Sequence, residues 1–265
     1  MSKIKILLLE VIVFINFFVN AAPIQENNSI RLMSYNIRNG RGMDNITDYN
    51  RIADIINKVN PDVIALQELD SVTNRSGGID VLDILSGKTL RHATYAAAID
   101  YDGGKYGVGI LSKEKPLSVR KIKLPGGEEE RILLIVELNE YYFGCTHLSL
   151  NAEDRLKSVE IIMGEAEKLD KPFFLAGDMN SLPESQEQKY LNESFVKLNL
   201  YKENTFPSDN PSICIDYIYG YRGTENWSRL TYRGVISEKV ASDHLPLYVE
   251  VRLHSDINDT LKMLQ

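Results

Sequence analysis

The sequence predicts one α+β domain organised as a four-layer sandwich, in which two packed, mostly antiparallel β-sheets are flanked by helices. About ten short apolar runs have the composition of strands, and only a few segments carry helical periodicity. The strands fall into two groups with helices outside them, which is typical of a layered sandwich. In the middle of the chain the strands follow one another too closely for repeated strand–helix–strand units. Hydrophobic residues make up 43% and charged residues 25% of the chain, as in ordinary globular proteins.

The first 21 residues are predicted to be a signal peptide. Lys3 and Lys5 precede an apolar run, and Val19 and Ala21 fit the small-x-small pattern of a cleavage site after Ala21. An uncleaved membrane anchor is the alternative, but the run is short for a full span and no basic stop follows it. We therefore expect export to the periplasm or the medium, with residues 22–29 as a short leader.

The first group of strands is expected between residues 30 and 113. Ile52, Ile55, Ile56 and Val59 recur at helical spacing, and the segment ends at Asn60 before a proline. The run that follows is almost wholly apolar, as in strands that are buried on both faces. The sequence predicts helices over 48–60 and 79–87, and strands over 30–38, 62–69, 93–100 and 106–113.

The second group begins with hairpins and contains the clearest helix of the chain. The turn at residues 125–130 separates two strands, and a second hairpin follows at residues 139–140. The helix over 152–169 has one apolar stripe formed by Leu156, Val159, Met163, Ala166 and Leu169. Further strands are predicted over 117–124, 131–139, 141–150, 172–180, 215–221, 230–237 and 245–253. The folded domain is thus expected over 30–254, with residues 255–265 as a tail containing a short helix.

Six predicted strands carry polar side chains at their carboxyl ends or in the loops that follow. Such groups are costly at the ends of apolar strands unless they are paired, so we infer that they share one site. The side chains are Asn36, Gln67 with Glu68, His147, Asp178 with Asn180, Asp216, and Asp243 with His244.

The residue types in this set limit its chemistry. Carboxylates and amides are hard oxygen ligands, which suit Mg²⁺, Mn²⁺ or Ca²⁺ rather than Zn²⁺. The chain has four histidines, and two of them, His147 and His244, belong to the set. Isolated imidazoles among acids suit proton transfer or phosphate contact better than metal ligation.

Taken in order, the six segments resemble the endonuclease/exonuclease/phosphatase superfamily, which has the fold of pancreatic deoxyribonuclease. The similarity runs from about Ile30 to Leu253. Each motif alone is weak, but six in family order are specific. They read SYNIRNG, ALQELD, CTHLSL, AGDMNS, CIDYIY and SDHLPL. The resemblance implies a phosphoester hydrolase that depends on Mg²⁺, with Mn²⁺ or Ca²⁺ as alternatives.

The resemblance also implies a role for each residue that would lie near the metal. Glu68 would be the main metal ligand. Asn36 and Asp243 would lie beside the metal and bind it directly or through water. A divalent cation lowers the charge of a phosphoester and acidifies a bound water, so this assignment is chemically consistent.

The remaining residues of the set would act on the phosphate and the attacking water. Asp178 and Asn180 would orient the water or hold the phosphate, and His147 would be a second phosphate contact. His244 would contact phosphoryl oxygens or act as the general base, with Asp216 orienting its ring. Asp178 and His244 both remain candidates for the general base.

Four further residues have expected roles outside this set. Arg75, Tyr106 and Arg155 are candidate substrate contacts, although an Arg on an amphipathic helix is usually only solvated. Ser242 is expected to cap a turn, because a Ser adjacent to its own Asp and His cannot form a nucleophilic triad with them.

The substrate class stays open at this stage. We expect an exported phosphodiesterase-type enzyme acting on nucleic acid, a nucleotide or a phospholipid head group. A secreted endonuclease is one alternative, although the net charge of −7 disfavours broad contact with phosphates. A sphingomyelinase-like phospholipid phosphodiesterase is another, with Trp227 as a candidate membrane-facing side chain, and a non-catalytic binding protein ranks last. The protein is expected to be a monomer with no obligate protein partner.

The two cysteines, Cys145 and Cys214, lie two residues before His147 and Asp216. If each pair lies on a strand, its members share a face, so the two thiols are expected near each other beneath the site. An exported protein can pair them as a disulfide, and two buried free thiols are the alternative.

Overall fold

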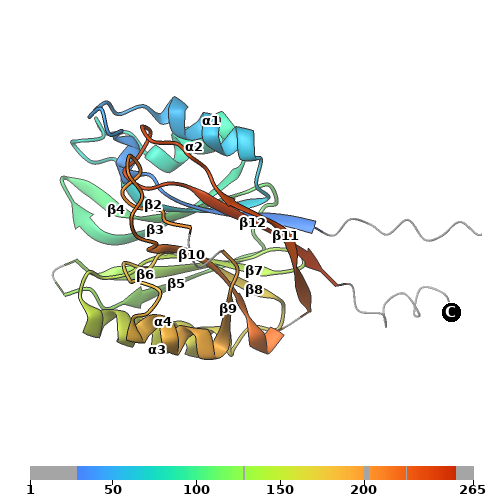
Figure 1. The fold of residues 1–265 in the computed structure, drawn as a ribbon. Coiled ribbons are helices and arrows are strands. Elements are labelled where there is room, and N and C mark those ends of the chain that lie inside the picture. The colour runs from blue at the N-terminus through green and yellow to red at the C-terminus, as the bar shows by residue number, and fades with distance from the viewer. Residues whose placement is uncertain (1–28, 128, 200–202, 225, 255–265) are drawn as a thin grey trace, which may run out of the picture.

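The computed structural model describes residues 29–254, except residues 128, 200–202 and 225. Two six-stranded sheets face each other, and helices cover the outer side of each sheet (Figure 1). The layers therefore run helix, sheet, sheet, helix, which confirms the predicted sandwich. The predicted signal peptide and the predicted C-terminal helix lie outside the described residues.

The first sheet combines strands from both ends of the domain. Its order is β11-β12-β1-β2-β4-β3, and only the β1–β2 pair is parallel. The strands are β1 (Ser29–Asn36), β2 (Val63–Ser71), β3 (His92–Tyr101), β4 (Gly104–Ser112), β11 (Trp227–Val235) and β12 (Leu247–Leu253).

The second sheet is formed by one continuous stretch of chain. Its order is β5-β6-β7-β8-β10-β9, and only the β7–β8 pair is parallel. The strands are β5 (Ser118–Leu124), β6 (Arg131–Glu137), β7 (Tyr142–His147), β8 (Phe173–Asp178), β9 (Phe195–Lys197) and β10 (Asp216–Tyr221).

Four helices cover the sheets, two on each outer face. α1 (Tyr49–Val59) and α2 (Val81–Thr89) pack on the first sheet, whereas α3 (Ala152–Ala166) and α4 (Gln186–Ser194) pack on the second (Figure 1). Each begins at a side chain that accepts a hydrogen bond from a first-turn N–H, which stabilises the helix start; these caps are Asp48, Asp80, Asn151 and Ser185. Within the described residues, none is both long and apolar enough to span a membrane.

Three apolar clusters occupy the three interfaces between layers. The largest fills the space between the two sheets and includes Leu134 and Val249. A second lies between the second sheet and α3 with α4, and a third lies between the first sheet and α1 with α2. Each sheet is thus buried on both faces, which explains the almost continuous apolar runs of β2 and β6.

Trp227 belongs to the inter-sheet core and not to a membrane-facing loop. Trp227 is 7% exposed. Its ring packs edge-on against the ring of Phe174, and the two ring centroids lie 5.4 Å apart. The expectation of a membrane-facing Trp227 was therefore wrong, because β11 begins at this residue and its side chain packs in the core between the sheets.

The two cysteines are free thiols in different cores, so the predicted proximity was wrong. Cys145 lies in the core between the sheets, whereas Cys214 lies in the core under α3 and α4. The expectation assumed that both lie on strands. Cys214 precedes β10, which begins at Asp216, so the alternation of side chains along a strand does not apply to it.

Candidate functional site

A cavity of about 560 Å³ opens where catalytic-type side chains from both sheets meet. Its lining includes seven of the residues singled out in the sequence: Glu68, Tyr106, His147, Asp178, Asn180, Asp243 and His244. Asn36 and Asp216 are buried and are hydrogen-bonded to lining residues. The structure therefore brings the six predicted segments to one place.

The strands explain why these side chains meet. Asn36, His147 and Asp178 are the last residues of β1, β7 and β8. Asp216, however, is the first residue of β10, and the Asp243–His244 pair precedes β12. The expectation of carboxyl ends fails for these because both strands run antiparallel to their neighbours, so their starts lie at the same edge.

One row across the second sheet holds three of the polar groups. His147 is opposite Asp178 in the parallel β7–β8 ladder, and Asp178 is opposite Asp216 in the antiparallel β8–β10 ladder. Side chains at paired positions point to the same face of a sheet, so the ladders themselves place the three groups together.

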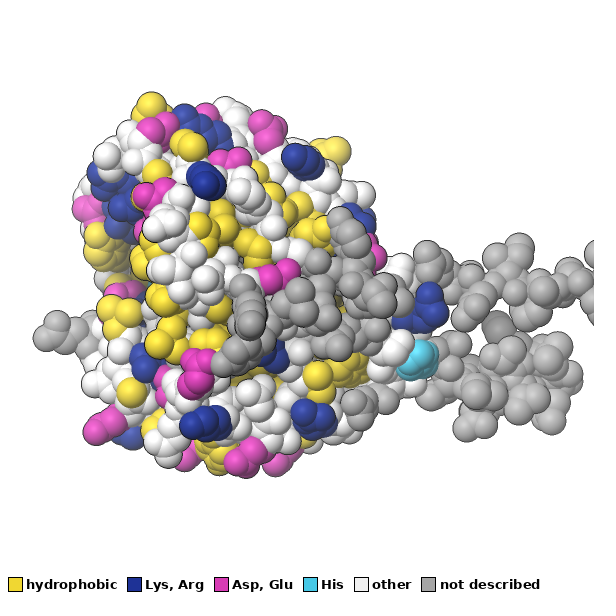
Figure 2. All heavy atoms as spheres, in the orientation of Figure 1, with side chains coloured by type: hydrophobic (Ala, Val, Ile, Leu, Met, Phe, Trp, Pro, Cys, Tyr) yellow, Lys and Arg dark blue, Asp and Glu magenta, His cyan; other side chains and the backbone are white. Residues whose placement is uncertain are grey.

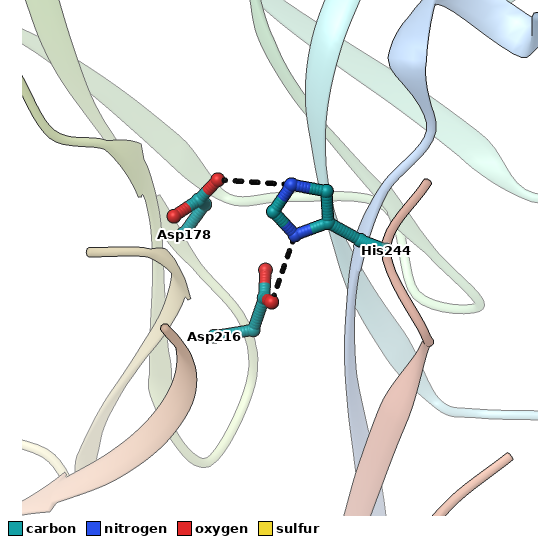
Figure 3. Close-up of side chains that lie close together, drawn as sticks. All are labelled: Asp178, Asp216 and His244. Atoms are coloured by element: carbon teal, nitrogen blue, oxygen red, sulfur yellow. Dashed lines mark hydrogen bonds and ion pairs between the residues drawn. The ribbon is translucent and has the colours of Figure 1, made fainter. Parts of the chain in front are cut away.

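His244 comes from the other sheet's side and reaches Asp216. Its Nδ1 lies 2.9 Å from Asp216 Oδ2, and its Nε2 lies 3.7 Å from Asp178 Oδ2 (Figure 3). Because an ionised carboxylate only accepts, Nδ1 carries a proton. Burial alone would lower the pKa of His244, but the charges of Asp216, Asp178 and Asp243 outweigh it and raise the pKa to about 10. His244 is therefore an imidazolium at neutral pH.

His147 has the opposite protonation state. Its Nε2 lies 3.6 Å from the same oxygen, Oδ2 of Asp178. Burial, the larger effect, lowers the pKa of His147 to about 4 against the opposing charge of Asp178, and nearby Arg131 and His244 lower it further. One neutral and one charged imidazole thus flank a single carboxylate oxygen.

Asn36 links this carboxylate to the first sheet. Its Nδ2 donates to Asp178 Oδ2 at 3.1 Å and to Glu68 Oε1 at 3.0 Å, while its Oδ1 accepts from the backbone N–H of Arg38 at 3.1 Å. The side-chain amide therefore fixes the separation of two carboxylates that would otherwise repel each other.

Glu68 sits at a local irregularity in β2. The β2–β4 register shifts between Leu66 and Leu69, and Glu68 has a φ of 59°. Such a left-handed conformation is strained for a non-glycine residue, and bulges of this kind turn side chains toward functional sites. The bulge aims the carboxylate of Glu68 into the cavity instead of leaving it in the regular alternation of the strand.

Negative charge accumulates around Glu68. Burial, opposed by the hydrogen bond from Asn36 and reinforced by the charges of Asp243 and Asp178, raises the pKa of Glu68. One guanidinium offsets part of this charge, because Arg38 Nε lies 3.4 Å from Asp243 Oδ2. A bound cation would relieve the remaining repulsion.

Two separate groups of side chains could hold that cation. Ligand atoms of Asp178, Asp216 and His244 all lie within 4.8 Å of one another. In that group, however, the hydrogen bond between His244 and Asp216 occupies one imidazole nitrogen and one carboxylate oxygen. Glu68, Asp243 and the second lone pair of Asn36 Oδ1 offer only oxygen, which fits Mg²⁺ better.

Asn180 and Ser242 stabilise the loops of the site. Asn180 has a φ of 47°, its N–H donates to Asp178 Oδ1 at 2.9 Å, and its Nδ2 donates to the carbonyl of Leu148 at 2.9 Å. Ser242 Oγ donates to the carbonyl of Asn36 at 2.8 Å and accepts from the N–H of His244 at 3.3 Å. Ser242 therefore ties a loop, in agreement with the turn cap predicted for it.

The structure gives Arg75 and Arg155 carboxylate partners outside the cavity lining. Arg75 forms a bidentate pair with buried Asp70, with N–O distances of 2.7 and 2.8 Å, and its guanidinium lies over the ring of Tyr101. Arg155 Nε lies 2.5 Å from Glu187 Oε1. Neither arginine belongs to the cavity lining and each pairs with a carboxylate, so their contact with substrate stays a prediction.

Several lining residues escaped the sequence analysis. Arg131 is 6% exposed, and its Nη1 lies 2.5 Å from Glu129 Oε1, while its buried Nε has no acceptor among the described residues. Arg131 begins β6, which runs antiparallel to β7, so it lies at the edge where His147 ends β7. That antiparallel pairing was the available signal. The apolar part of the lining is formed by Leu150, Leu182, Phe206, Ile213 and Ile215.

Comparison with known proteins agrees with this geometry. The model of the Endonuclease/Exonuclease/phosphatase family matches residues 33–244. No curated protein sequence matches the chain.

Solved structures with the same fold share little sequence with the chain. An endonuclease/exonuclease/phosphatase from Beutenbergia cavernae has a TM-score of 0.68 at 21% identity, over 86% of this chain and 72% of that one. D. rerio TDP2 complexed with a single strand DNA product has a TM-score of 0.67 at 18% identity, over 84% and 99%. The Bacteroides thetaiotaomicron mannosyl-6-phosphatase has a TM-score of 0.64 at 16% identity, over 84% and 99%. At these identities the likeness concerns the fold.

Proposed function

Because the chain belongs to the endonuclease/exonuclease/phosphatase family, whose members hydrolyse phosphoesters, we propose that it is an exported, divalent-metal-dependent phosphodiesterase. One observation carries the proposal beyond the family. His147 and His244 lie 3.6 and 3.7 Å from the same oxygen of Asp178, and His244 is held by Asp216. This arrangement has a proton acceptor between two groups that can donate to phosphoryl oxygens.

The protein residues divide the work of hydrolysis. Asp178 accepts the proton of the attacking water, because its Oδ2 lies between the two imidazoles, whereas His244 is held by Asp216 and its raised pKa favours the charged ring. The Nε2–H of His244 and a ring N–H of His147 donate to phosphoryl oxygens, where negative charge grows in the transition state. Asn180 is neutral and can approach the same oxygens without repulsion.

Glu68, Asn36 and Asp243 are the residues that we propose to hold the metal, with Mg²⁺ preferred and Mn²⁺ or Ca²⁺ as alternatives. When bound, the cation neutralises phosphoester charge and acidifies water. The raised pKa of Glu68 fits this assignment, since burial, and after it the charges of Asp243 and Asp178, make an unpaired negative charge costly there.

A small phosphodiester is the substrate that best fits the cavity. Its volume of about 560 Å³ matches sites for small organic ligands. Single-stranded nucleic acid is the second candidate, because a TDP2 structure with this fold carries a DNA product. Two observations argue against extended nucleic acid as the substrate. The net charge of the chain is −7, and on the face drawn in Figure 2 Lys and Arg are interspersed with Asp and Glu.

Hydrolysis of bis-p-nitrophenyl phosphate tests the proposal. With Mg²⁺ added to EDTA-treated protein, we expect turnover in the wild type and a loss of about 100-fold or more in Glu68→Gln and His244→Gln, as for removal of one transition-state contact. Glu130→Gln, which changes a carboxylate on the surface hairpin, should keep full activity. Equal rates in all four proteins would overturn the proposal.

Two further measurements refine the result. Mg²⁺ should raise the melting temperature of the wild type but not that of Glu68→Gln, which tests metal binding without turnover. Plasmid DNA, RNA and sphingomyelin vesicles should be poorer substrates than small diesters. Faster cleavage of DNA with a steep salt dependence would instead assign the nuclease.

Export rests on the basic start and apolar run of residues 1–21. The mature protein should therefore begin at Ala22, which the intact mass of protein from a secreting host measures. A mass that includes residues 1–21 in membrane fractions would favour the anchor.

A further inference from the structure

α4 is unusual because the side chains that it buries are mostly polar. Glu187 is 3% exposed and Gln188 is 2% exposed, beside a single buried apolar residue, Leu191. Burying a carboxylate and an amide is unfavourable unless each finds partners. Both do find partners: Glu187 pairs with Arg155 of α3, and Gln188 bonds to Ser181 in the loop after β8 and to Tyr219 of β10.

Glu187 acts on the loop after β7 through Arg155. Arg155 Nε lies 2.5 Å from Glu187 Oε1, and Arg155 Nη1 donates to the carbonyls of Ser149 at 3.1 Å and Leu150 at 2.8 Å. The side chain of Arg155 is only 12% exposed. A single guanidinium therefore connects α3, α4 and the two residues that follow His147 and Leu148.

The same loop contacts the loop after β8. The N–H of Leu148 donates to the carbonyl of Asp178 at 2.9 Å, and the Leu148 carbonyl accepts from Asn180 Nδ2 at 2.9 Å. On the other side, Gln188 Nε2 donates to Ser181 Oγ at 2.7 Å. α4 thus fixes both loops, one through Arg155 and one through Gln188.

We propose that Arg155 is a positioning residue that holds His147 and Asn180 in register, with Glu187 of α4 fixing its guanidinium. The inference rests on the proposed function for its catalytic meaning. Without Arg155 the carbonyls of residues 149 and 150 lose their donor and the loop shifts. Leu148 then no longer holds the amide of Asn180, and a displacement of about 1 Å costs up to about 100-fold in rate.

A double-mutant cycle on kcat tests this role. Arg155→Met should lower kcat about 10- to 100-fold with KM nearly unchanged, since the residue does not touch substrate. In an Asn180→Ala background the same change should cost less than in the wild type, because one of the two residues that Arg155 positions is already gone and only the effect on His147 remains. Lys157→Met, at an exposed position two residues along α3, is the matched control and should keep the wild-type kcat.

The Arg155→Lys variant tests the same role if Arg155→Met does not fold. It keeps a cation beside Glu187 but lacks the fork that reaches two carbonyls together, so it should fold and still lose kcat. Glu187→Gln keeps an acceptor for Arg155 and should retain most of kcat. Two results would overturn the proposal. One is a kcat of the Arg155→Met, Asn180→Ala double variant that is reduced by the full product of the two single reductions, and the other is a wild-type kcat in Arg155→Lys.

A second readout does not depend on turnover. The chain has only four histidines, so ¹⁵N-histidine labelling gives few ring signals. The His147 signals should move in Arg155→Met and stay in place in Lys157→Met. If the wild type hydrolyses no phosphoester, the proposed function fails, and these signals still decide whether Arg155 positions His147. Unmoved His147 signals would contradict the inference.

Discussion

At the scale of single residues, the site depends on how one carboxylate is surrounded. Asp178 Oδ2 has His147, His244 and the amide of Asn36 within 3.7 Å. Burial lowers the pKa of both rings, but only His244 has a second carboxylate, Asp216, to outweigh it, whereas His147 lies near the guanidinium of Arg131. The environment alone thus assigns different states to two chemically identical side chains.

The low pKa of His147 predicts acid sensitivity of the metal-free protein. The pKa is about 4 in the folded state and about 6.5 in the unfolded chain, so the unfolded state binds the extra proton between these values. The contribution of neutral His147 to the free energy of unfolding is fully present above pH 6.5. It falls by about 3 kcal/mol as the pH is lowered to 4. Asp178, Arg131 and His244 are the charged groups that face His147.

Urea unfolding at pH 7 and pH 4.5 measures this effect. Relative to His147→Gln, which does not titrate, the wild type should lose more free energy of unfolding on acidification. The same loss in both proteins would mean that His147 is not buried in its neutral form.

Most members of the site and the pairing of His244 with Asp216 were predictable from sequence, whereas the partners of the arginines were not. Asn36, Glu68 and Asp178 stand out because polar groups end or interrupt strongly apolar strands. The partner of Arg155, Glu187, is 32 residues away on a helix that carries little sequence signal. Tertiary packing decides which arginine pairs with a carboxylate and which arginine contacts substrate.

At the scale of elements, the parallel β7–β8 pair sets the site's geometry. Gly177 lies opposite Thr146, one position before His147 and Asp178 in the ladder. A Cβ on Gly177 would lie 2.0 Å from the carbonyl oxygen of Thr146, so only glycine allows this approach.

Gly177→Ala should therefore destabilise the protein by about 3 kcal/mol or more, because the clash is with backbone and cannot relax by a side-chain rotation. Gly164→Ala is the control. It lies within α3 with no atom within 4 Å of its would-be Cβ, so it should stabilise by about 0.5–1 kcal/mol. Urea unfolding of both variants measures the difference, and similar stabilities would contradict the account.

The sequence predicted elements with strong periodicity and missed those without it. α1 and α3 carry an apolar stripe, and β2 and β6 contain long apolar runs, so all four were expected close to their observed bounds. α4 and β9 were not predicted. α4 buries Glu187 and Gln188, and a pattern based on hydrophobic residues cannot detect buried polar side chains that are satisfied by distant partners.

At the scale of the whole molecule, each sheet supplies one half of the site. The first sheet and its loops contribute Asn36, Glu68, Asp243 and His244, and the second contributes His147, Asp178 and Asp216. The hydrogen bonds from Asn36 to Asp178 and between His244 and Asp216 cross from one half to the other. The relative placement of the sheets is therefore part of the active geometry.

Both thiols report on this packing. Cys145 is 0% and Cys214 is 2% exposed, and burial raises the pKa of each to about 12. The native protein should show no rapid reaction with a thiol reagent such as DTNB, and both thiols should react after unfolding in urea without reductant. If the unfolded protein did not react with DTNB, the two cysteines would form a disulfide. Rapid reaction of the native protein would show that the reagent reaches a thiol in one of the cores.

The topology also determines when the site can exist during synthesis. The second sheet, from β5 to β10, is inserted between strands of the first sheet, and Ser242 bonds to Asn36 across 206 positions of the chain. Asn36 and Glu68 leave the ribosome early, whereas Asp243 and His244 emerge only after the entire second sheet has been made. A growing chain therefore lacks Asp243 and His244 until just before β12, so the candidate site is complete only once the strands of both sheets have been made.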